Sequence, residues 1–230
     1  MRKTLLIFSL LTLFGVSANA QTNMSKFGLK LGPTFDWANS GSTTAKYEGI
    51  RIGCNLGLVY DCYLSDNIAV SSGVNFNLLR MKYSFTDIRE VEDFLEETNV
   101  MVNRRLKAVN VEIPIKLKVK MNVVDSFNAY VEAGGGLSFN CKDFGKDDYS
   151  FSWVTYEDQS YVDYTDQYRP LQLSMIFGLG TEYEINRNLS AFAQLTFDHA
   201  FSNAFNSLLA KQTGSILRNN YVGIETGIMF

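Results

Sequence analysis

Residues 109–121 read Val-Asn-Val-Glu-Ile-Pro-Ile-Lys-Leu-Lys-Val-Lys-Met, and this stretch decides the fold class. Every odd-numbered residue in it is apolar, whereas the even-numbered residues include one glutamate and three lysines. Successive side chains of a β-strand point to opposite faces, so a period of two gives the strand one apolar and one charged face. A helical period does not fit the same pattern. The stretch is therefore predicted to be a β-strand.

Seven further segments show the same alternation. They are residues 26–37, 50–62, 68–78, 129–140, 171–185, 189–198 and 221–230. The face opposite the apolar one is rich in glycine and other small or polar residues, as a crowded interior requires. A single-chain membrane barrel has an even number of antiparallel strands. We therefore predict an all-β fold, an eight-stranded antiparallel up-and-down transmembrane β-barrel.

The connections between these segments alternate in length. Three are short turns, and the other four, at about residues 38–47, 84–107, 141–169 and 202–217, are long. Membrane barrels combine short periplasmic turns with long extracellular loops, so both termini are predicted to be periplasmic. The alternation slips near Leu79, which indicates a bulge or the membrane boundary. Within the second long connection, apolar residues at helical spacing predict a short surface helix over Asp87–Glu97.

Composition alone hides a membrane protein of this kind. Charged residues make up 20% of the chain, and after residue 20 no apolar run reaches the ~18 residues of a membrane helix. A barrel strand gives only every second residue to lipid, so its average hydropathy stays low. A soluble β-sandwich or lipocalin-like barrel also has alternating strands. The glycine-rich polar face and the aromatic residues near strand ends favour the membrane barrel.

The N-terminal segment predicts export. Arg2 and Lys3 precede an apolar run, and Ala18-Asn19-Ala20 forms an Ala-x-Ala site, as in a Sec signal peptide cleaved after Ala20. The expected domains are residues 1–20, the signal peptide, and residues 21–230, one outer-membrane barrel. Without Arg2 and Lys3 the chain has 19 basic and 24 acidic residues, a balance that argues against nucleic acid as a partner.

The chain has three cysteines, an odd number for an exported protein. Cys54 and Cys62 lie in one predicted strand, about 26 Å apart, which is far beyond the reach of a disulfide. Whether Cys141 pairs with either is left open. We expect all three to act as small apolar side chains.

Five segments carry a family resemblance. They are Phe27–Gly32, Val111–Lys118, Tyr130–Gly136, Phe177–Gly180 and the final Phe230. In order and spacing they resemble the PorT-type small outer-membrane β-barrels of Gram-negative bacteria, over nearly the whole mature chain. The resemblance implies an outer-membrane location and an eight-stranded fold, and the name-giving members are linked to type IX protein secretion. It also implies that Phe230 is the aromatic assembly signal read by the barrel-assembly machinery.

Charges of both signs lie on the polar faces of the predicted strands. They include Lys30, Arg51, Glu112, Lys116, Glu132, Glu182 and Glu225. Because the interior of an eight-stranded barrel is barely wide enough for side chains, we expect opposite charges to form a hydrogen-bonded lumen charge network. The alternative is a narrow path for ions or protons.

The third long connection is rich in aromatic and acidic residues. Its candidate recognition residues are Trp153, Tyr156, Tyr161 and Tyr164. Tyr and Trp among polar residues suit molecular recognition, and the carboxylates suit Ca²⁺, although EF-hand spacing is absent. The alternative is that the strands continue beyond the membrane and the aromatic side chains pack within a hairpin.

His199 is the only histidine, and Ser202 follows it closely. Some lipid A deacylase barrels use a His and a Ser on one face of a strand, but these two positions have opposite parity, so a triad geometry fails. We expect His199 to be an interfacial residue at the outer rim.

The expected function is a non-enzymatic outer-membrane barrel without a catalytic residue, a cofactor or a metal site. It is predicted to be envelope-structural or to bind a partner through its extracellular loops. The alternatives are a small-solute pore and a lipid A-modifying enzyme. The expected partners are outer-membrane lipid and lipopolysaccharide, the barrel-assembly machinery and an unidentified extracellular or envelope protein, but not nucleic acid.

Overall fold

The computed structural model describes residues 25–40, 45–47, 49–90, 97–151, 154–157, 161–186, 188–206 and 216–230. The predicted signal peptide, residues 1–20, lies outside this described part.

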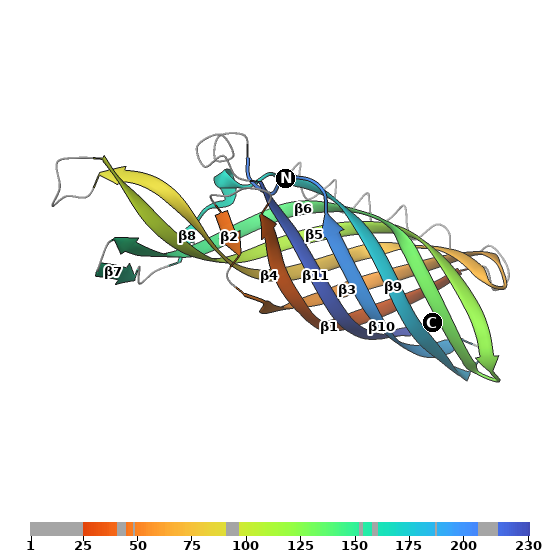
Figure 1. The fold of residues 1–230 in the computed structure, drawn as a ribbon. Helices are drawn as coiled ribbons and strands as arrows, with labels where there is room; N and C mark the ends of the chain where they lie inside the picture. Colours follow the sequence, from red (N-terminus) through yellow and green to blue (C-terminus); the bar gives the residue numbers. More distant parts are fainter. Residues whose placement is uncertain are drawn as a thin grey trace, which may run out of the picture.

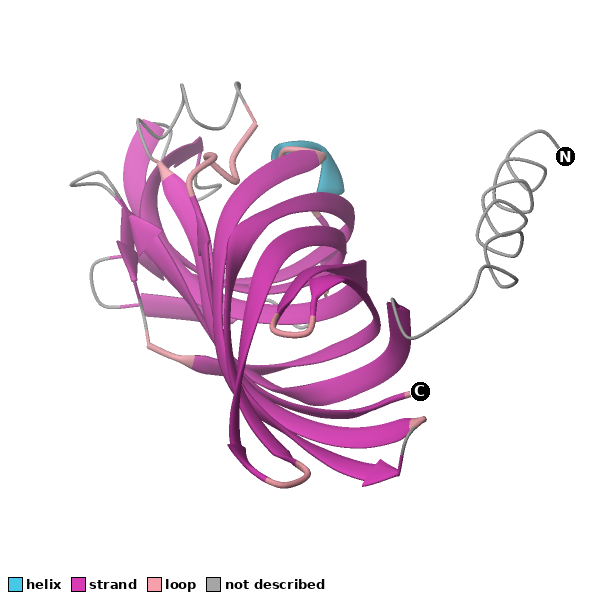
Figure 2. Ribbon diagram, turned by 90° about the vertical axis from the view of Figure 1, so that its right-hand side faces the viewer, coloured by secondary structure: helices cyan, strands magenta, loops and turns pink. Residues whose placement is uncertain are grey.

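Almost every described segment is a β-strand (Figure 2). The eight long strands are β1 (Ser25–Ser40), β3 (Arg51–Ser65), β4 (Ile68–Glu90), β5 (Glu97–Val124), β6 (Phe127–Phe151), β9 (Leu171–Asn186), β10 (Leu189–Ala200) and β11 (Leu217–Met229). The short elements are β2 (Ala45–Tyr47), β7 (Val154–Glu157), β8 (Val162–Asp163) and the 3-10 helix η2 (Thr165–Gln167). Among the described residues, no helix is long and apolar enough to cross a membrane. Each of the eight predicted strands coincides with one of the long strands, so the predicted number and order of strands are confirmed.

The long strands form one closed antiparallel sheet (Figure 1). Their order around the barrel is β4-β3-β1-β11-β10-β9-β6-β5, and the pairing of β4 with β5 closes the ring. The first and last strands, β1 and β11, are neighbours in this ring. The predicted eight-stranded up-and-down barrel is therefore confirmed.

The two ends of the barrel differ. At one end, short turns join β3 to β4, β5 to β6 and β9 to β10, and Ser126 adopts a positive φ of 66° in the middle one. The backbones of Phe27 and Phe230 hydrogen-bond to each other at 2.9 and 2.7 Å, which places both ends of the described chain here. At the opposite end, β4, β5 and β6 run on past the other strands, accompanied by β7 (Figure 1).

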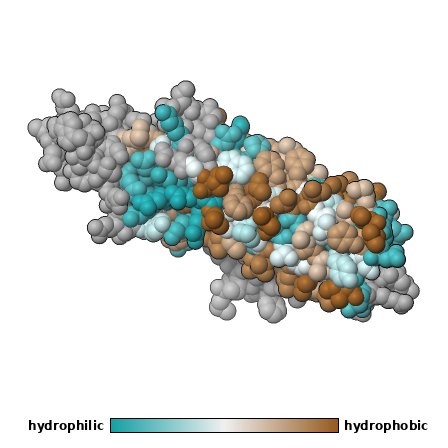
Figure 3. Space-filling view, turned by 60° about the horizontal axis from the view of Figure 1, so that its bottom comes forward, coloured by the Kyte–Doolittle hydropathy of each residue, from teal (hydrophilic) through white to brown (hydrophobic). Residues whose placement is uncertain are grey.

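The outer face of the barrel wall carries a band of exposed apolar side chains. It includes Leu29, Leu31, Ile52, Leu56, Leu58, Phe76, Leu78, Ile115, Leu117, Leu173, Phe177, Leu179, Leu195, Ile224 and Ile228. Figure 3 shows apolar residues gathered over one part of the molecule and hydrophilic ones over the part nearer the long extensions. A soluble sandwich or lipocalin-like barrel would bury this face, so the band identifies the surface that contacts lipid.

Polarity inverts beyond the band. In β4 the inward positions change from Asn75 and Asn77 to Leu79 and Met81, while the outward positions change from Leu78 to Arg80. The strand keeps one register with β5 along its whole length, so the bulge considered near Leu79 is wrong. The slip in the sequence pattern instead records the change from lipid to water outside the barrel.

A bulge does occur in β6, at Cys141. Asn110 pairs with Asn140 but Val109 pairs with Lys142, so one extra residue stands in β6. The inward positions of β6 therefore switch from even to odd numbers beyond this point. The bulge explains why parity cannot be carried through residue 141 from the sequence alone.

The helix predicted over Asp87–Glu97 is wrong where the structure describes it. Asp87–Glu90 belong to β4 and Glu97 begins β5, and the two segments pair with each other. Residues 91–96 lie outside the described residues. Pairing along an already formed ladder overrides a helical spacing of a few apolar residues. For the same reason much of the predicted second and third loops is strand.

All three cysteines are free. Cys54 and Cys141 are exposed and Cys62 is half-buried. The prediction that Cys54 and Cys62 do not pair with each other is confirmed, and Cys141, whose pairing the sequence left open, is a free thiol.

Candidate functional site

The lumen at the short-turn end holds a network of lysines around Glu182. This carboxylate forms an ion pair with the Lys120 ammonium at 2.9 Å and accepts a hydrogen bond from Lys26 at 3.1 Å, and the ammonium of Lys118 lies 3.7 Å away. Lys118 also pairs with Asp61 at 2.7 Å. Glu182 and Asp61 are completely buried, so each depends on these partners for its charge to be tolerated.

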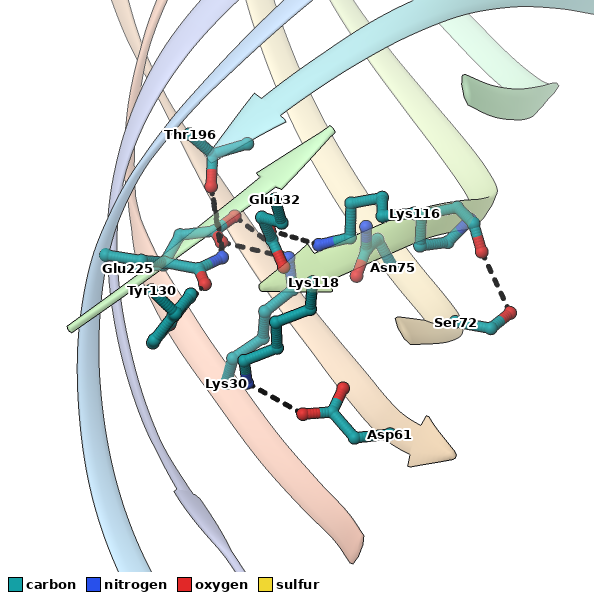
Figure 4. A network of polar contacts seen from close by, with 12 residues as sticks. Lys30, Asp61, Ser72, Asn75, Lys116, Lys118, Tyr130, Glu132, Thr196 and Glu225 are labelled. Carbon is teal, nitrogen blue, oxygen red and sulfur yellow. Dashed lines mark hydrogen bonds and ion pairs between the residues drawn. The ribbon is translucent and has the colours of Figure 1, made fainter. Parts of the chain in front are cut away.

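A second layer lies further along the axis (Figure 4). The Lys30 ammonium donates to both oxygens of Glu225, at 2.9 and 3.1 Å. Glu225 also accepts from Gln194 at 2.5 Å and from Thr196 at 3.0 Å. Beside this group Lys116 pairs with Glu132. The contacts of this layer thus join neighbouring strands of the wall: β1 with β11, β11 with β10, and β5 with β6.

Tyr130 links the two layers, and glycine makes room for it. The Lys118 ammonium lies 4.2 Å from the centre of the Tyr130 ring, and the Tyr130 hydroxyl donates a hydrogen bond to Gln194 at 2.7 Å. A Cβ atom at Gly180 would lie 2.4 Å from the Tyr130 ring, and one at Gly178 would lie 2.4 Å from Glu132. These glycines on the polar face are required by the close packing of the lumen.

The third layer contains two carboxylates without a lysine. Glu112 accepts hydrogen bonds from Asn75 at 2.7 Å and Asn77 at 3.2 Å, and Asp198 accepts one from Ser174 at 2.7 Å. Beside them is a cavity of about 20 Å³, measured as the space open to the centre of a water molecule. Such a space holds about one or two waters, far less than a channel.

An apolar cluster closes the mouth of the barrel above this cavity, at the end opposite the short turns. We call it the outer-mouth cluster: Ala38, Leu79, Met81, Tyr83, Phe85, Val102, Leu106, Ala108, Tyr168, Ala204, Phe205, Leu217 and Tyr221. Residues 165–168 and 204–206 fold across the opening, since Arg169 N–H donates to the Ala204 carbonyl at 2.8 Å and Asn206 N–H to that of Gln167 at 2.9 Å. The aromatic rings of Tyr83 and Tyr168 both pack on Phe205.

Arg104 is buried beside this cluster. Its guanidinium forms a two-pronged ion pair with Asp147 at 2.7 and 2.8 Å, lies 3.8 Å from the Tyr164 ring centre and donates to Gln167 at 2.7 Å. Burial by itself lowers the pKa of Arg104, but the neighbouring Tyr83 and the hydrogen-bonded Asp147 raise it above its ordinary value. Arg104 therefore stays charged and joins β5, β6 and the η2 segment. Sequence reasoning missed it because its position lay in a predicted loop.

The lumen residues named from the sequence divide into two groups. Lys30, Glu112, Lys116, Glu132, Glu182 and Glu225 are all buried inside the barrel. Arg51 is exposed at the first residue of β3 and does not belong with them, because its strand begins at the end opposite the short turns. The network also includes Lys26, Lys118 and Lys120. All three occupy even-numbered positions on the polar faces of the predicted strands, so the alternation in the sequence already indicates that they lie in the lumen.

The candidate recognition residues lie in strands and their connections. Trp153 lies outside the described residues, and Tyr156 is in β7, which pairs with β6. Tyr161 is 46% exposed, with the Lys107 ammonium 3.9 Å from its ring centre. Tyr164 is half-buried under Arg104 and donates to Asp147 at 3.1 Å. The alternative, in which both flanking strands continue beyond the membrane as one hairpin, holds for one strand only: β6 runs on to Phe151 and pairs with β5 and β7, whereas β9 begins at Leu171.

His199 lies on the outer face of β10 between Phe197 and Phe201, whose ring centres are 6.4 and 6.2 Å from its own. Its Nδ1 lies 2.6 Å from the side-chain oxygen of Asn220. The Ser202 hydroxyl accepts a hydrogen bond from the backbone N–H of Leu173 at 2.9 Å. Each side chain is thus held by a different partner. Among the described residues, no three His, Cys, Asp or Glu side chains are grouped so as to hold a metal ion.

The sequence of the barrel also matches the model of a known protein family. The family model described as outer membrane protein beta-barrel domain matches residues 19–210. The chain belongs to this family. Membership and the lipid-facing band together place the protein in the outer membrane.

Solved outer-membrane barrels resemble this family member in fold alone. A major outer membrane protein from Thermus thermophilus is 14% identical, with 90% of this chain and 99% of that chain covered and a TM-score of 0.46. OprG from Pseudomonas aeruginosa is 12% identical, with 90% and 96% covered and a TM-score of 0.44. Neisserial surface protein A is 9% identical, with 88% and 95% covered and a TM-score of 0.41. No curated protein matches the chain by sequence.

Proposed function

We propose that this outer-membrane barrel is a closed, non-enzymatic anchor that presents its outer extension to a partner. The short-turn end, with both described chain ends, lies in the periplasm. The extension formed by β4, β5, β6 and β7 lies outside the cell. This orientation follows the usual arrangement of short periplasmic turns and longer external segments.

The observation that carries the proposal is the filled lumen. Two layers of ion pairs block the barrel within the lipid band, and the outer-mouth cluster blocks it above. The space between them is about 20 Å³, with Leu79, Ala200 and Tyr221 in its wall. A solute path would require charged groups to part from their partners inside a low-dielectric barrel, which costs several kcal/mol each, about 3–5 for a broken buried pair.

Planar-bilayer recording tests closure. The refolded protein, verified by its heat-modifiable gel shift, is expected to give no stepwise current, while a general porin inserted in the same way provides the positive control. Reproducible current steps would overturn the closed barrel and favour the small-solute pore.

The partner is proposed to bind the outer extension, where Tyr156 lies in β7 and Tyr161 is exposed. PorT-type membership and a link to type IX secretion rest on the resemblance of the five segments. Affinity capture with a tag inserted between β4 and β5 is expected to recover an envelope or extracellular protein. Recovery that is unchanged after Tyr161→Ala and deletion of β7 would contradict the site.

The enzymatic alternative concerns lipid A. His199 and Ser202 hydrogen-bond to Asn220 and Leu173 and not to each other in the described contacts. Mass spectrometry of lipid A from a deletion strain is expected to show an unchanged acylation pattern. Loss of one lipid A species, restored by the wild-type gene but not by His199→Ala, would establish the enzyme instead.

A further inference from the structure

The small cavity in the third lumen layer is lined mainly by side chains that carry oxygen. Glu112 of β5 and Asp198 of β10 both reach it, although β6 and β9 separate their strands in the ring. The two residues are 1% and 5% exposed, so neither carboxylate has bulk water as a partner. The described residues in the wall of the cavity include no lysine, arginine or histidine. Two carboxylates therefore share one buried space without a basic side chain in its described wall.

The hydrogen bonds that these two carboxylates accept come from neutral groups. Asn75 and Asn77 donate to Glu112 at 2.7 and 3.2 Å, and the Ser174 hydroxyl donates to Asp198 at 2.7 Å. Neutral donors solvate a carboxylate, but they do not balance its charge, and a buried charge needs an ionic partner or a metal. In the other two layers, by contrast, each glutamate described above pairs with a lysine ammonium. The third layer lacks this balance among the described residues.

Three further oxygen atoms at the same cavity have no hydrogen-bond partner among the described residues. They are the side-chain oxygens of Asn110, Asn219 and Tyr221. These residues are only 3%, 8% and 3% exposed. A buried polar atom without a partner is costly and rare in native proteins. Three such atoms around one cavity indicate an occupant that they all contact.

The occupant has to satisfy both the charges and the unpaired oxygens. A proton shared between the two carboxylates removes one negative charge but gives nothing to the amide oxygens. Water molecules donate to those oxygens but leave both charges in place. A metal cation contacts carboxylate, amide and hydroxyl oxygens alike, and it also balances the charge. The cavity of about 20 Å³ suits a single ion with at most a water beside it.

The set of oxygen ligands favours calcium among the common cations. Ca²⁺ takes roughly six to eight oxygen atoms in a flexible arrangement, and its double charge matches two carboxylates. Mg²⁺ requires a strict octahedron and keeps several of its waters, for which this cavity has no room. A monovalent cation leaves one of the two buried carboxylates uncompensated.

We propose that the third lumen layer binds one Ca²⁺ ion. Glu112 and Asp198 supply carboxylate oxygens, Asn110 and Asn219 supply amide oxygens, and the Tyr221 hydroxyl and a water complete the shell. The ion takes the role that lysine ammonium groups have in the other two layers, and it ties β5 to β10 and β11 across the lumen. The site lies inside the closed barrel and is independent of the partner proposed for the outer extension.

Refolding of the full mature chain in neutral detergent, with CaCl₂ or with EDTA, tests the site. After gel filtration, elemental mass spectrometry is expected to find about one calcium per barrel in the protein refolded with CaCl₂. The temperature at which the gel shift is lost is expected to be higher with CaCl₂ than with EDTA, because an ion bound only to the folded state stabilises it. MgCl₂ at the same concentration is expected to give a much smaller rise.

The variant Glu112→Gln/Asp198→Asn removes both charges while keeping the shape of the side chains. It is expected to fold without calcium, to bind the ion at least about tenfold more weakly and to lose the calcium-dependent rise. Asn110→Ala keeps both charges and is expected to weaken binding as well. The matched control is Asp125→Asn/Glu184→Gln, which removes two exposed carboxylates at the short-turn end and is expected to bind as the wild type.

The gel shift verifies that each variant is folded before its calcium is measured. A wild-type protein with the same thermal stability in CaCl₂ and in EDTA would overturn the proposal and leave a shared proton as the balance of charge. Wild-type affinity in both the folded double variant and Asn110→Ala would overturn it too, since the calcium would then lie on other acidic residues. An equal rise with MgCl₂ would contradict the choice of calcium.

Discussion

At the scale of single residues, the lumen depends on close matching of charge. Glu132 is 5% exposed and pairs with Lys116, which is 6% exposed, so neither group has water as an alternative partner. Removing one member of such a pair leaves the other buried and uncompensated. The same reasoning applies to Lys30 and Glu225.

Glu132→Gln is therefore expected to lower the free energy of unfolding by about 3–5 kcal/mol. The double variant Lys116→Gln/Glu132→Gln removes both charges and is expected to recover a large part of that loss. Urea titration of the barrel in lipid vesicles, followed by the gel shift, measures both. A single variant as stable as the wild type would show that the pair contributes little.

Asp143, inside the outer mouth, predicts a pH dependence. Burial is the main cause that raises the pKa of Asp143 to about 6. The hydrogen bond from Asn140 lowers this pKa, and the nearby charge of Asp163 raises it further. Because the folded pKa lies above the ordinary value of 3.8, the stability contributed by protonation is present at low pH. It is lost as the pH rises from about 4 to about 6.

Amide hydrogen exchange around β8 and η2, after correction for the intrinsic pH dependence, is therefore expected to show weaker protection at about pH 7 than at about pH 4. Asp143→Asn is expected to remove most of this change. An unaltered pH profile in the variant would assign the change to another group.

At the scale of elements, long strands explain both the success and the failures of sequence reasoning. Alternation locates all eight strands because most lipid-facing positions are apolar and most lumen positions are polar or small, although Ile176, Phe192 and Met229 are apolar and buried on the inner face. It fails beyond Leu79 because the outer surface there meets water, and beyond Cys141 because the bulge exchanges the two faces of β6. Lumen residues were predictable by parity, whereas Arg104 and Asp147 were not, since their pairing depends on a register that no local pattern encodes.

Arg104 is expected to hold the η2 segment against the barrel. Arg104→Ala removes its contacts with Asp147, Tyr164 and Gln167, so hydrogen exchange in residues 161–168 is expected to rise at least about tenfold while that of the barrel wall stays unchanged. Arg105→Ala, one residue further and on the opposite face, is the control and is expected to leave these residues protected. Equal effects of the two variants would refute a specific role for Arg104.

At the scale of the whole molecule, one part of the barrel wall faces lipid and the other part faces water. Its lower part has lipid outside and ion pairs inside, and its outer part has cations outside and an apolar cluster inside. The aromatic group of Trp37, Phe197, His199 and Phe201 lies on β1, β10 and the residue after β10, and we expect it at the headgroup level.

Trp37 reports this level directly. In a Trp153→Phe variant, Trp37 remains as the one tryptophan of the chain, and lipids brominated near the headgroup are expected to quench its fluorescence more than lipids brominated at the chain ends. A Phe27→Trp variant of the same protein, with Trp37→Phe, provides the comparison from the opposite rim. Stronger quenching of Trp37 from the chain ends would place the membrane elsewhere on the barrel.

The inversion of polarity at Leu78 and Leu79 should also be detectable in the pattern of substitutions that the protein tolerates. Below that row, charged substitutions are tolerated at lumen positions that offer a partner and rejected at outward ones. Above it, the tolerated and rejected positions exchange places along β4. A saturation mutagenesis scan scored only by growth or surface display would thus show an alternating pattern of tolerated positions, and the phase of this pattern would reverse at the lipid boundary. The position of the membrane along the barrel could therefore be determined from the survival of variants alone.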